Sequence, residues 1–264
     1  MIGRNLFQSC AKVTKLNRIK IGLIGGTDSS HGSGLHADLQ TVKKMHFSGV
    51  PAISAITLQN NSANVRIFPL PAKGFDSQLT ELLNVELDAI KIGMLPDEIS
   101  VQLVCEFLDK TACQRVVLDP VHSTSCGHQL ISDQGWNLLL KKLLTRVGLV
   151  TPNLDEVIRI LGPEYRDETD AVKLLNKCAD FETKAVLLKG GHLATKWCTD
   201  VLAEKNKPFL EFKKKRISGG SKVRGTGCRL ATAIACFWAK ENDLASAVEH
   251  AGKFLNDYIL KKIS

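Results

Sequence analysis

The sequence contains no long hydrophobic run. Across its 264 residues, no stretch approaches the roughly 18 consecutive apolar residues of a membrane-spanning helix. We therefore exclude an integral membrane protein and expect no membrane partner. Apolar residues make up 44% and charged residues 23% of the chain. These ordinary values for a globular domain exclude a disordered chain, a collagen and a coiled coil.

The eight cysteines never form a Cys-x-x-Cys pair. The absence of such pairs argues against a zinc knuckle and against a redox-active dithiol. Apolar neighbours in the sequence predict that the thiols are reduced and mostly buried. Such thiols are typical of a reducing compartment, so we expect a cytoplasmic protein.

Aromatic residues are scarce, at 6% of the chain, and few of them lie among the basic residues. The net charge is +8, from 35 Lys and Arg against 27 Asp and Glu. A positive charge of this size suits nucleic acid, anionic lipid or phosphorylated small molecules. Because aromatic side chains are missing from the basic stretches, a stacking platform for nucleic acid is not expected. We predict a small-molecule partner and no nucleic acid.

The first 20 residues contain no acidic side chain, whereas five of them are basic. They also lack a continuous apolar segment, so they do not match a secretory signal peptide. They match an organellar transit peptide only in their charge. We predict a basic extension over residues 1–18, followed by a single domain over residues 19–264.

Apolar strands alternate with amphipathic helical patterns from about residue 19 to the end of the chain. The first strand is predicted over residues 19–24 and ends at Gly25 and Gly26, before a helical pattern. This alternation predicts an α/β fold, with a central, mostly parallel β-sheet flanked by helices on both faces. Right-handed crossovers place the loops after the strands at one edge, where open α/β sheets bind ligands. Further strands are predicted at residues 50–58, 89–94, 115–119, 149–151 and 185–189.

The loop after the first predicted strand is rich in glycine and small polar residues. Its backbone amides can bind an anion or a polar ligand. Its match to a dinucleotide fingerprint is weak, because the second strand ends without an acid for a ribose hydroxyl. We interpret it as a small-molecule loop. Asp38, on the helix that follows, is either a ligand for a polar substrate or a solvated helix carboxylate.

A second glycine cluster, Gly225-Thr226-Gly227-Cys228, precedes an apolar helical pattern. Free amides and the positive end of the helix dipole suit a phosphate, or a transition state that develops negative charge. The chain has no Gly-x-x-x-x-Gly-Lys-Ser/Thr sequence, so a phosphoryl transferase of this kind is not a P-loop enzyme. A cysteine in the first helical turn is expected to have a lowered pKa. The Cys228 thiolate can take a proton from a hydroxyl group or help to position that hydroxyl group. The alternative is that Cys228 is simply a small buried residue that packs at the start of the helix.

Polar residues also lie at the carboxyl ends of three other predicted strands: Asp119, Asn153 with Glu156, and Lys189. A carboxylate and an amide at this edge can bind Mg²⁺ directly or through water. Asn153 and Glu156 equally match the two positions of a capping box. Lys189 suits the charge of a phosphate. The chain has neither a Ser/His/Asp order nor an HExxH motif, which argues against a hydrolase.

In their chain order, these motifs resemble the ribokinase-like superfamily, and within it the hydroxymethylpyrimidine and phosphomethylpyrimidine kinases of thiamine biosynthesis. The resemblance covers about residues 20–260. Most superfamily members carry an aspartate at the position of Cys228, so the cysteine indicates the pyrimidine kinase branch or the pyridoxal kinases that resemble it. The matching stretches are Gly26-Thr27-Asp28, Gly34-Leu35-His36-Ala37-Asp38-Leu39-Gln40-Thr41, Leu58-Gln59-Asn60, Lys91-Ile92-Gly93-Met94-Leu95, Asp119-Pro120-Val121, Thr151-Pro152-Asn153-Leu154-Asp155-Glu156, Lys189-Gly190-Gly191-His192 and Gly225-Thr226-Gly227-Cys228.

The resemblance implies a kinase that uses ATP and Mg²⁺ and is usually a homodimer. The implied acceptor is 4-amino-5-hydroxymethyl-2-methylpyrimidine, its monophosphate, or both. The aminopyrimidine would be bound by Gly26, Asp38, Gln59 and Met94. An anion hole would be formed by Gly225, Thr226 and Gly227, with Cys228 facing the accepting hydroxyl. Nucleotide contacts are implied for Asn153, Lys189 and Thr226, and Mg²⁺ contacts for Asp119 and Glu156.

Two other functions stay open at this point. One is a pyridoxal or pyridoxine kinase of the cysteine-containing type, and the other is a catalytically silent relative that binds the pyrimidine. Several positions depart from the family pattern, three of which bear on ligand binding. His31 replaces a usual glycine, His122 lies in an unusual Asp-Pro loop, and Arg224 directly precedes the anion hole. His31 and Arg224 either contact an additional phosphate or reflect variation at the surface.

Overall fold

The computed structural model describes residues 18–263, apart from residues 31, 60–64, 125, 167, 169, 179–182 and 191–195 and the side chain of Gln59. The described residues form a nine-stranded sheet in the order β3-β2-β1-β4-β5-β6-β7-β8-β9. The strands are β1 (Lys20–Asp28), β2 (Ser48–Gln59), β3 (Val65–Pro69), β4 (Ala89–Ile92), β5 (Val116–Leu118), β6 (Leu149–Val150), β7 (Ala185–Leu188), β8 (Trp197–Glu204) and β9 (Leu210–Lys215).

The centre of the sheet is parallel and its edges are antiparallel. Strands β2, β1, β4, β5, β6 and β7 run in one direction. At the edges, β3 pairs antiparallel with β2, and β8 and β9 continue the sheet antiparallel from β7. This arrangement confirms the predicted α/β fold with a mostly parallel sheet.

The first strand is longer than predicted. The prediction that it ends at Gly25 and Gly26 is wrong, because β1 continues through both glycines to Asp28. A Cβ atom on Gly26 would lie 2.8 Å from the Met94 sulfur, which is closer than real side chains approach. The glycine therefore allows the segment after β4 to pack directly against the end of β1.

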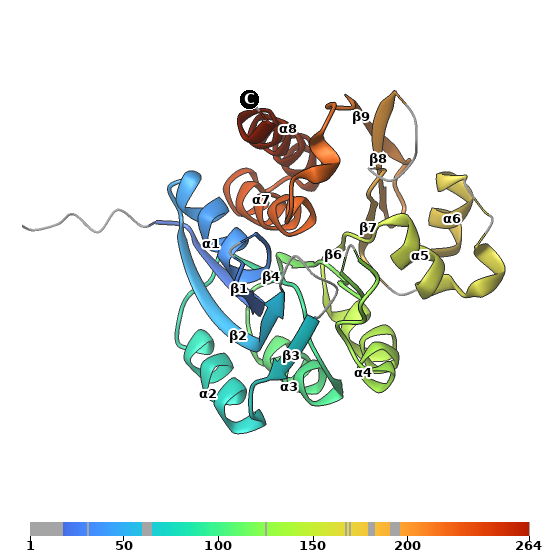
Figure 1. Cartoon of the computed structure of the whole chain (residues 1–264). Helices are drawn as coiled ribbons and strands as arrows, with labels where there is room; N and C mark the ends of the chain where they lie inside the picture. The colour runs from blue at the N-terminus through green and yellow to red at the C-terminus, as the bar shows by residue number, and fades with distance from the viewer. Residues whose placement is uncertain are drawn as a thin grey trace, which may run out of the picture.

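Helices cover both faces of the sheet (Figure 1). The helices α2, α3, α4, α5 and α6 pack on one face, and α1, α7 and α8 pack on the other. Their bounds are α1 (Gly34–Lys44), α2 (Ala72–Leu83), α3 (Glu98–Lys110), α4 (Asp133–Leu138), α5 (Leu154–Leu161), α6 (Ala171–Cys178), α7 (Thr226–Glu241) and α8 (Leu244–Ile263).

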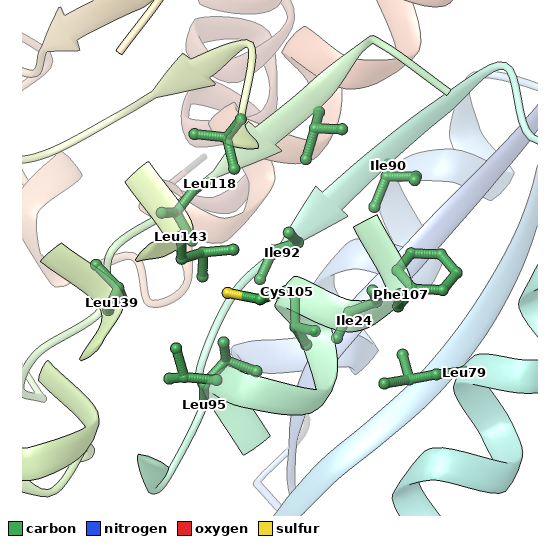
Figure 2. Packing of buried hydrophobic residues seen from close by; sticks show 14 of the residues in the cluster. Ile24, Leu79, Ile90, Ile92, Leu95, Cys105, Phe107, Leu118, Leu139 and Leu143 are labelled. Carbon is green, nitrogen blue, oxygen red and sulfur yellow. The ribbon is translucent and has the colours of Figure 1, made fainter. Parts of the chain in front are cut away.

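Alternate residues of each strand contribute to the two hydrophobic layers. Figure 2 shows the first layer, where Ile90 and Ile92 of β4 face Cys105 and Phe107 of α3. Lys91 stands between these two isoleucines in the sequence, so its side chain points to the opposite face, toward α1 and α7. It is only 1% exposed there. A lysine buried this deeply requires a partner of opposite charge.

The order of the strands reverses at β1. Strand β2 pairs with one side of β1 and strand β4 with the other, both in parallel. In open α/β sheets, ligands bind outside the carboxyl ends of the strands at such a switch point. Asp28, Met94, Asp119 and Lys189 lie at or just after the carboxyl ends of β1, β4, β5 and β7. The topology thus gathers the predicted site residues at one edge.

Candidate active site

Asp38 is the counterion of the buried Lys91. The Lys91 ammonium donates to Asp38 Oδ2 at 2.8 Å, and Thr232 of α7 donates its hydroxyl to Asp38 Oδ1 at 2.8 Å. Burial alone would lower the pKa of Lys91, but the charge of Asp38 outweighs it and raises this pKa. These bonds join α1, β4 and α7 beside the site.

The alternative of a solvated helix carboxylate is wrong for Asp38, which is 0% exposed. Both of its oxygens are engaged inside the protein. Direct contact between Asp38 and a substrate stays a prediction, and it requires a neighbouring group to move aside, because Asp38 is completely buried. In the structure, the carboxylate instead fixes Lys91.

A second lysine–carboxylate cluster lies at the carboxyl ends of β5 and β7. The Lys189 ammonium donates to Asp119 Oδ1 at 2.8 Å and lies 3.8 Å from Glu156 Oε2. Burial would lower the pKa of Lys189, but Asp119 and Glu156 raise it instead. This ammonium is therefore charged at neutral pH. The structure brings together three residues that the sequence predicts for nucleotide and metal binding.

Glu156 belongs both to this cluster and to the start of α5. Its backbone N–H donates to Asn153 Oδ1, and the Asn153 N–H donates to Glu156 Oε2, each at 2.8 Å. This reciprocal pair is the predicted capping box, and it is confirmed. Burial raises the pKa of Glu156 to about 7, against the opposing charge of Lys189. The carboxyl group therefore titrates close to neutral pH.

The turn over residues 225–228 begins α7 and faces the second cluster. Gly225 is the N-cap residue with φ +71°, and a Cβ atom there would collide with the Gly32 carbonyl oxygen. A Cβ atom on Gly227 would lie 3.6 Å from the Lys189 ammonium and 3.7 Å from Asp119 Oδ2. The glycines therefore bring the positive end of α7 close to the Lys189 ammonium.

Cys228 lies in the first turn of α7, as predicted, but its thiol is not acidic. Burial raises its pKa to about 11. The charge of Lys91 acts in the opposite direction, whereas Asp38 and Asp119 raise the pKa further. The prediction of a lowered pKa is wrong, chiefly because the thiol is buried, and Asp38 and Asp119 add negative charge near the sulfur. The side chain is therefore a neutral thiol at neutral pH.

Two of the residues implied for pyrimidine binding, Gly26 and Met94, meet at the ends of β1 and β4. Gly26 contacts the Met94 side chain, and the Met94 carbonyl accepts a hydrogen bond from Ser54 Oγ at 2.7 Å. Gln59 ends β2, where it pairs with Val65 of β3. The side chain of Gln59, together with His31 and His192, lies outside the described residues.

Arg229 has no predicted role, although it adds a buried charge behind the 225–228 turn. Its side chain is 2% exposed, donates to Gln40 Oε1 at 2.8 Å and stacks 4.4 Å from the Tyr258 ring centre. Its Nη1 atom has no hydrogen-bond partner within the described part of the chain. This guanidinium increases the positive potential at the start of α7. Lys91 is the other buried cation without a predicted role, and its sequence signal is a charge inside an apolar strand.

A mostly parallel sheet, a glycine turn at a helix start and paired lysines and carboxylates at the strand ends define a kinase of the ribokinase-like class. None of the helices in the described residues is long and apolar enough to span a membrane. The chain belongs to the phosphomethylpyrimidine kinase family, whose model matches residues 28–264.

Curated relatives cover nearly the whole chain. The hydroxymethylpyrimidine/phosphomethylpyrimidine kinase of Aquifex aeolicus is 33% identical over 237 residues, which span 89% of this chain and 92% of the relative. The enzyme of the same name from Escherichia coli is 32% identical over 243 residues, which span 91% of each chain.

Solved structures of two related kinases share the fold. The phosphomethylpyrimidine kinase from Clostridium difficile 630 is 27% identical, with a TM-score of 0.77 over 92% of this chain and 100% of that chain. The pyridoxal kinase from Staphylococcus aureus in complex with pyridoxal is also 27% identical, with a TM-score of 0.80 over 90% of this chain and 87% of that chain.

Proposed function

We propose that the protein uses ATP to phosphorylate 4-amino-5-hydroxymethyl-2-methylpyrimidine, the monophosphate of this alcohol, or both. The observation that carries the proposal is the glycine turn at the start of α7, which faces the Lys189 ammonium and Asp119. The names of the curated relatives support the pyrimidine as the acceptor. The family model favours it over pyridoxal.

In the proposed reaction, the acceptor oxygen forms a bond to the γ-phosphorus of ATP. The bond from that phosphorus to the bridging oxygen breaks, and ADP leaves. The transition state is loose, so the protein acts mainly by positioning the two molecules and neutralising charge. The free amides of residues 225–228 and Thr226 would bind the transferred group. Cys228 would face the hydroxyl and, in its thiolate form, accept the proton of that hydroxyl.

The donor set at the second cluster fits Mg²⁺ bound together with a nucleotide. Asp119 and Glu156 both lie within ion-pair distance of Lys189, so their carboxylates are near each other. The described residues contain no group of three or more His, Cys, Asp or Glu arranged as a complete metal site. Mg²⁺ typically takes one or two carboxylates and completes its shell with phosphates and water.

We assign Mg²⁺ binding to Asp119 and Glu156, and the ATP phosphates to Lys189, Asn153 and Thr226. The bound ion would neutralise charge on the phosphates. On the acceptor side, Gly26, Gln59 and Met94 would contact the aminopyrimidine, and Asp38 would act there either directly or through Lys91. The region beside Gly26 and Met94, which lie in contact with each other, would then be the pyrimidine slot.

We further propose one domain over residues 19–264, which forms a homodimer. We place the contact between the two subunits on the surface of β2 and β3. The exposed apolar side chains there support this choice: Ile56 is 44%, Leu58 42% and Phe68 48% exposed. Unpaired apolar side chains on an edge hairpin are typical of a covered surface. The basic extension lies almost wholly outside the described residues. Six of the described cysteines, Cys105, Cys113, Cys126, Cys198, Cys228 and Cys236, are free thiols, which supports a cytoplasmic location.

A coupled assay of ADP formation tests the proposal. ADP should appear when the purified protein receives ATP, Mg²⁺ and the pyrimidine alcohol, and its formation should depend on the alcohol. Binding of the alcohol without any ADP formation would instead identify a silent, pyrimidine-binding relative.

A further inference from the structure

An arginine connects the loop after β1 to the anion-hole turn. Arg224 directly precedes Gly225, and its Nη1 donates to Ser30 Oγ at 3.0 Å. Its Nη2 lies 3.5 Å from Asp28 Oδ2. Asp28 ends β1 and Ser30 lies in the loop that follows. The guanidinium therefore lies at the boundary between the acceptor side of the site and the start of α7.

Asp28 has other donors besides Arg224. The Ser30 backbone N–H, the Ser30 hydroxyl and the Ser33 hydroxyl donate to its carboxylate at 2.6 to 2.9 Å. Burial would raise the pKa of Asp28, but these hydrogen bonds and the charge of Arg224 lower it. Asp28 is thus ionised at neutral pH. Loss of Arg224 would leave this negative charge unbalanced at the acceptor side.

The Arg224 side chain is partly exposed, and its stem lies against the loop after β1. The Arg224 side chain is 43% exposed. A Cβ atom on Gly32 would lie 3.4 Å from Arg224 Cβ, so the loop after β1 lies directly against the stem. An exposed guanidinium that is held in place presents its planar set of donors in a geometry that matches phosphate.

We propose that Arg224 binds the phosphate of a phosphorylated acceptor and so determines how well the enzyme carries out a second phosphorylation. This inference rests on the proposed function. In the second reaction, an oxygen of the acceptor's own phosphate forms the bond to the γ-phosphorus of ATP. The bond from that phosphorus to the bridging oxygen of ADP breaks, and a diphosphate ester and ADP result.

The acceptor's phosphate must then lie between the pyrimidine slot and the anion hole. Arg224 lies at this boundary, because it contacts the loop after β1 and directly precedes the 225–228 turn. A neutral alcohol has no phosphate for the guanidinium to bind. The contribution of Arg224 is therefore expected to differ between the two acceptors.

The experiment compares kcat/KM for the alcohol and for its monophosphate in the wild-type enzyme and in Arg224→Gln. We expect the monophosphate value to fall about 10- to 100-fold, the range of a charge-assisted hydrogen bond, and the alcohol value to fall far less. Arg224→Lys keeps the charge and should show an intermediate loss. The matched control is Lys222→Gln, which removes an exposed positive charge two residues earlier and should leave the ratio unchanged.

Because the measured quantity is a ratio within one preparation, partial unfolding of a variant cancels. An equal fall for both acceptors would overturn the proposal and leave Arg224 as a loop-positioning residue. No change for either acceptor, or a wild-type enzyme that accepts only the alcohol, would also overturn it. Failure of the proposed function gives a different result, since the wild-type enzyme would then phosphorylate neither acceptor.

Discussion

Lys91 lies inside the buried strand β4 and Lys189 directly follows the buried strand β7, and each has an aspartate oxygen 2.8 Å from its ammonium. Removal of one member of such a pair leaves an uncompensated buried charge and typically costs about 3–5 kcal/mol. The sequence indicates that Lys189 is a site residue, because it ends an apolar strand and glycines follow it. It does not indicate the role of Lys91, because its partner Asp38 is 53 residues away and belongs to a different helix.

Cys228 provides the residue-scale prediction. A base with a pKa of about 11 is almost entirely protonated at pH 6 to 9, so its active fraction rises about tenfold per pH unit. We expect kcat/KM for the alcohol to rise with pH over this range. Cys228→Ser should lower turnover about 10²- to 10⁴-fold, the usual contribution of a general base, and should leave ATP binding nearly unchanged.

The control for this prediction is Cys113→Ser, which replaces a partly buried thiol outside the site. Its rates and pH profile should match the wild-type enzyme. A Cys228→Ser variant that turns over at nearly the wild-type rate would assign Cys228 to packing or positioning. A flat wild-type pH profile would likewise argue against a thiolate base.

At the scale of elements, α5 and α7 each begin at the ligand-binding edge, and each start is fixed by a local sequence signal. The Asn153–Glu156 capping box and the glycine turn of α7 are short-range patterns, so both are predictable from the sequence. The electrostatic environments of the two helix starts, in contrast, are not predictable from the sequence. The raised pKa values of Cys228 and Glu156 both depend mainly on burial, and at Cys228 the charges of Asp38 and Asp119 raise the pKa further. These environments exist only after distant segments pack together.

Glu156→Gln separates the capping role of this residue from metal binding. Glutamine also serves at this capping-box position, so the start of α5 should be preserved. The substitution removes the charge that attracts Mg²⁺. We expect activity to fall and half-maximal activity to require more Mg²⁺. The control, Asp155→Asn, removes an exposed charge from the same helical turn and should leave the Mg²⁺ requirement unchanged.

The stability of the wild-type protein relative to this variant should depend on pH in a defined direction. The folded pKa of Glu156 is raised from 4.5 to about 7, so the folded state favours its protonated form. The stabilisation from this group is complete below about pH 4.5 and is lost as the pH rises through about 7. The melting temperature of the wild-type protein, relative to Glu156→Gln, should therefore fall between pH 5 and pH 8. If Glu156→Gln kept full activity at low Mg²⁺, Glu156 would have no role in metal binding and would act only in capping the start of α5.

At the scale of the whole molecule, the strand order explains why motifs spread over about 200 residues form one site. The parallel core is predictable, because each of its strands is a short apolar run followed by a loop or a helical pattern. Strand β8 is not predicted, because its buried Asp200 and exposed Trp197 break the expected pattern. Asp200 is stabilised by the Lys214 ammonium of β9, 2.7 Å away, a partner that only the folded sheet supplies.

The most direct test of the account is the specificity of phosphoryl transfer by the wild-type protein. The measurement compares kcat/KM for 4-amino-5-hydroxymethyl-2-methylpyrimidine and for pyridoxal under the same ATP and Mg²⁺ concentrations, with the phosphorylated product identified by mass spectrometry. The account predicts a phosphorylated pyrimidine and a kcat/KM for it well above that for pyridoxal. A higher kcat/KM for pyridoxal, or ATP consumption that yields no phosphorylated pyrimidine, would contradict it.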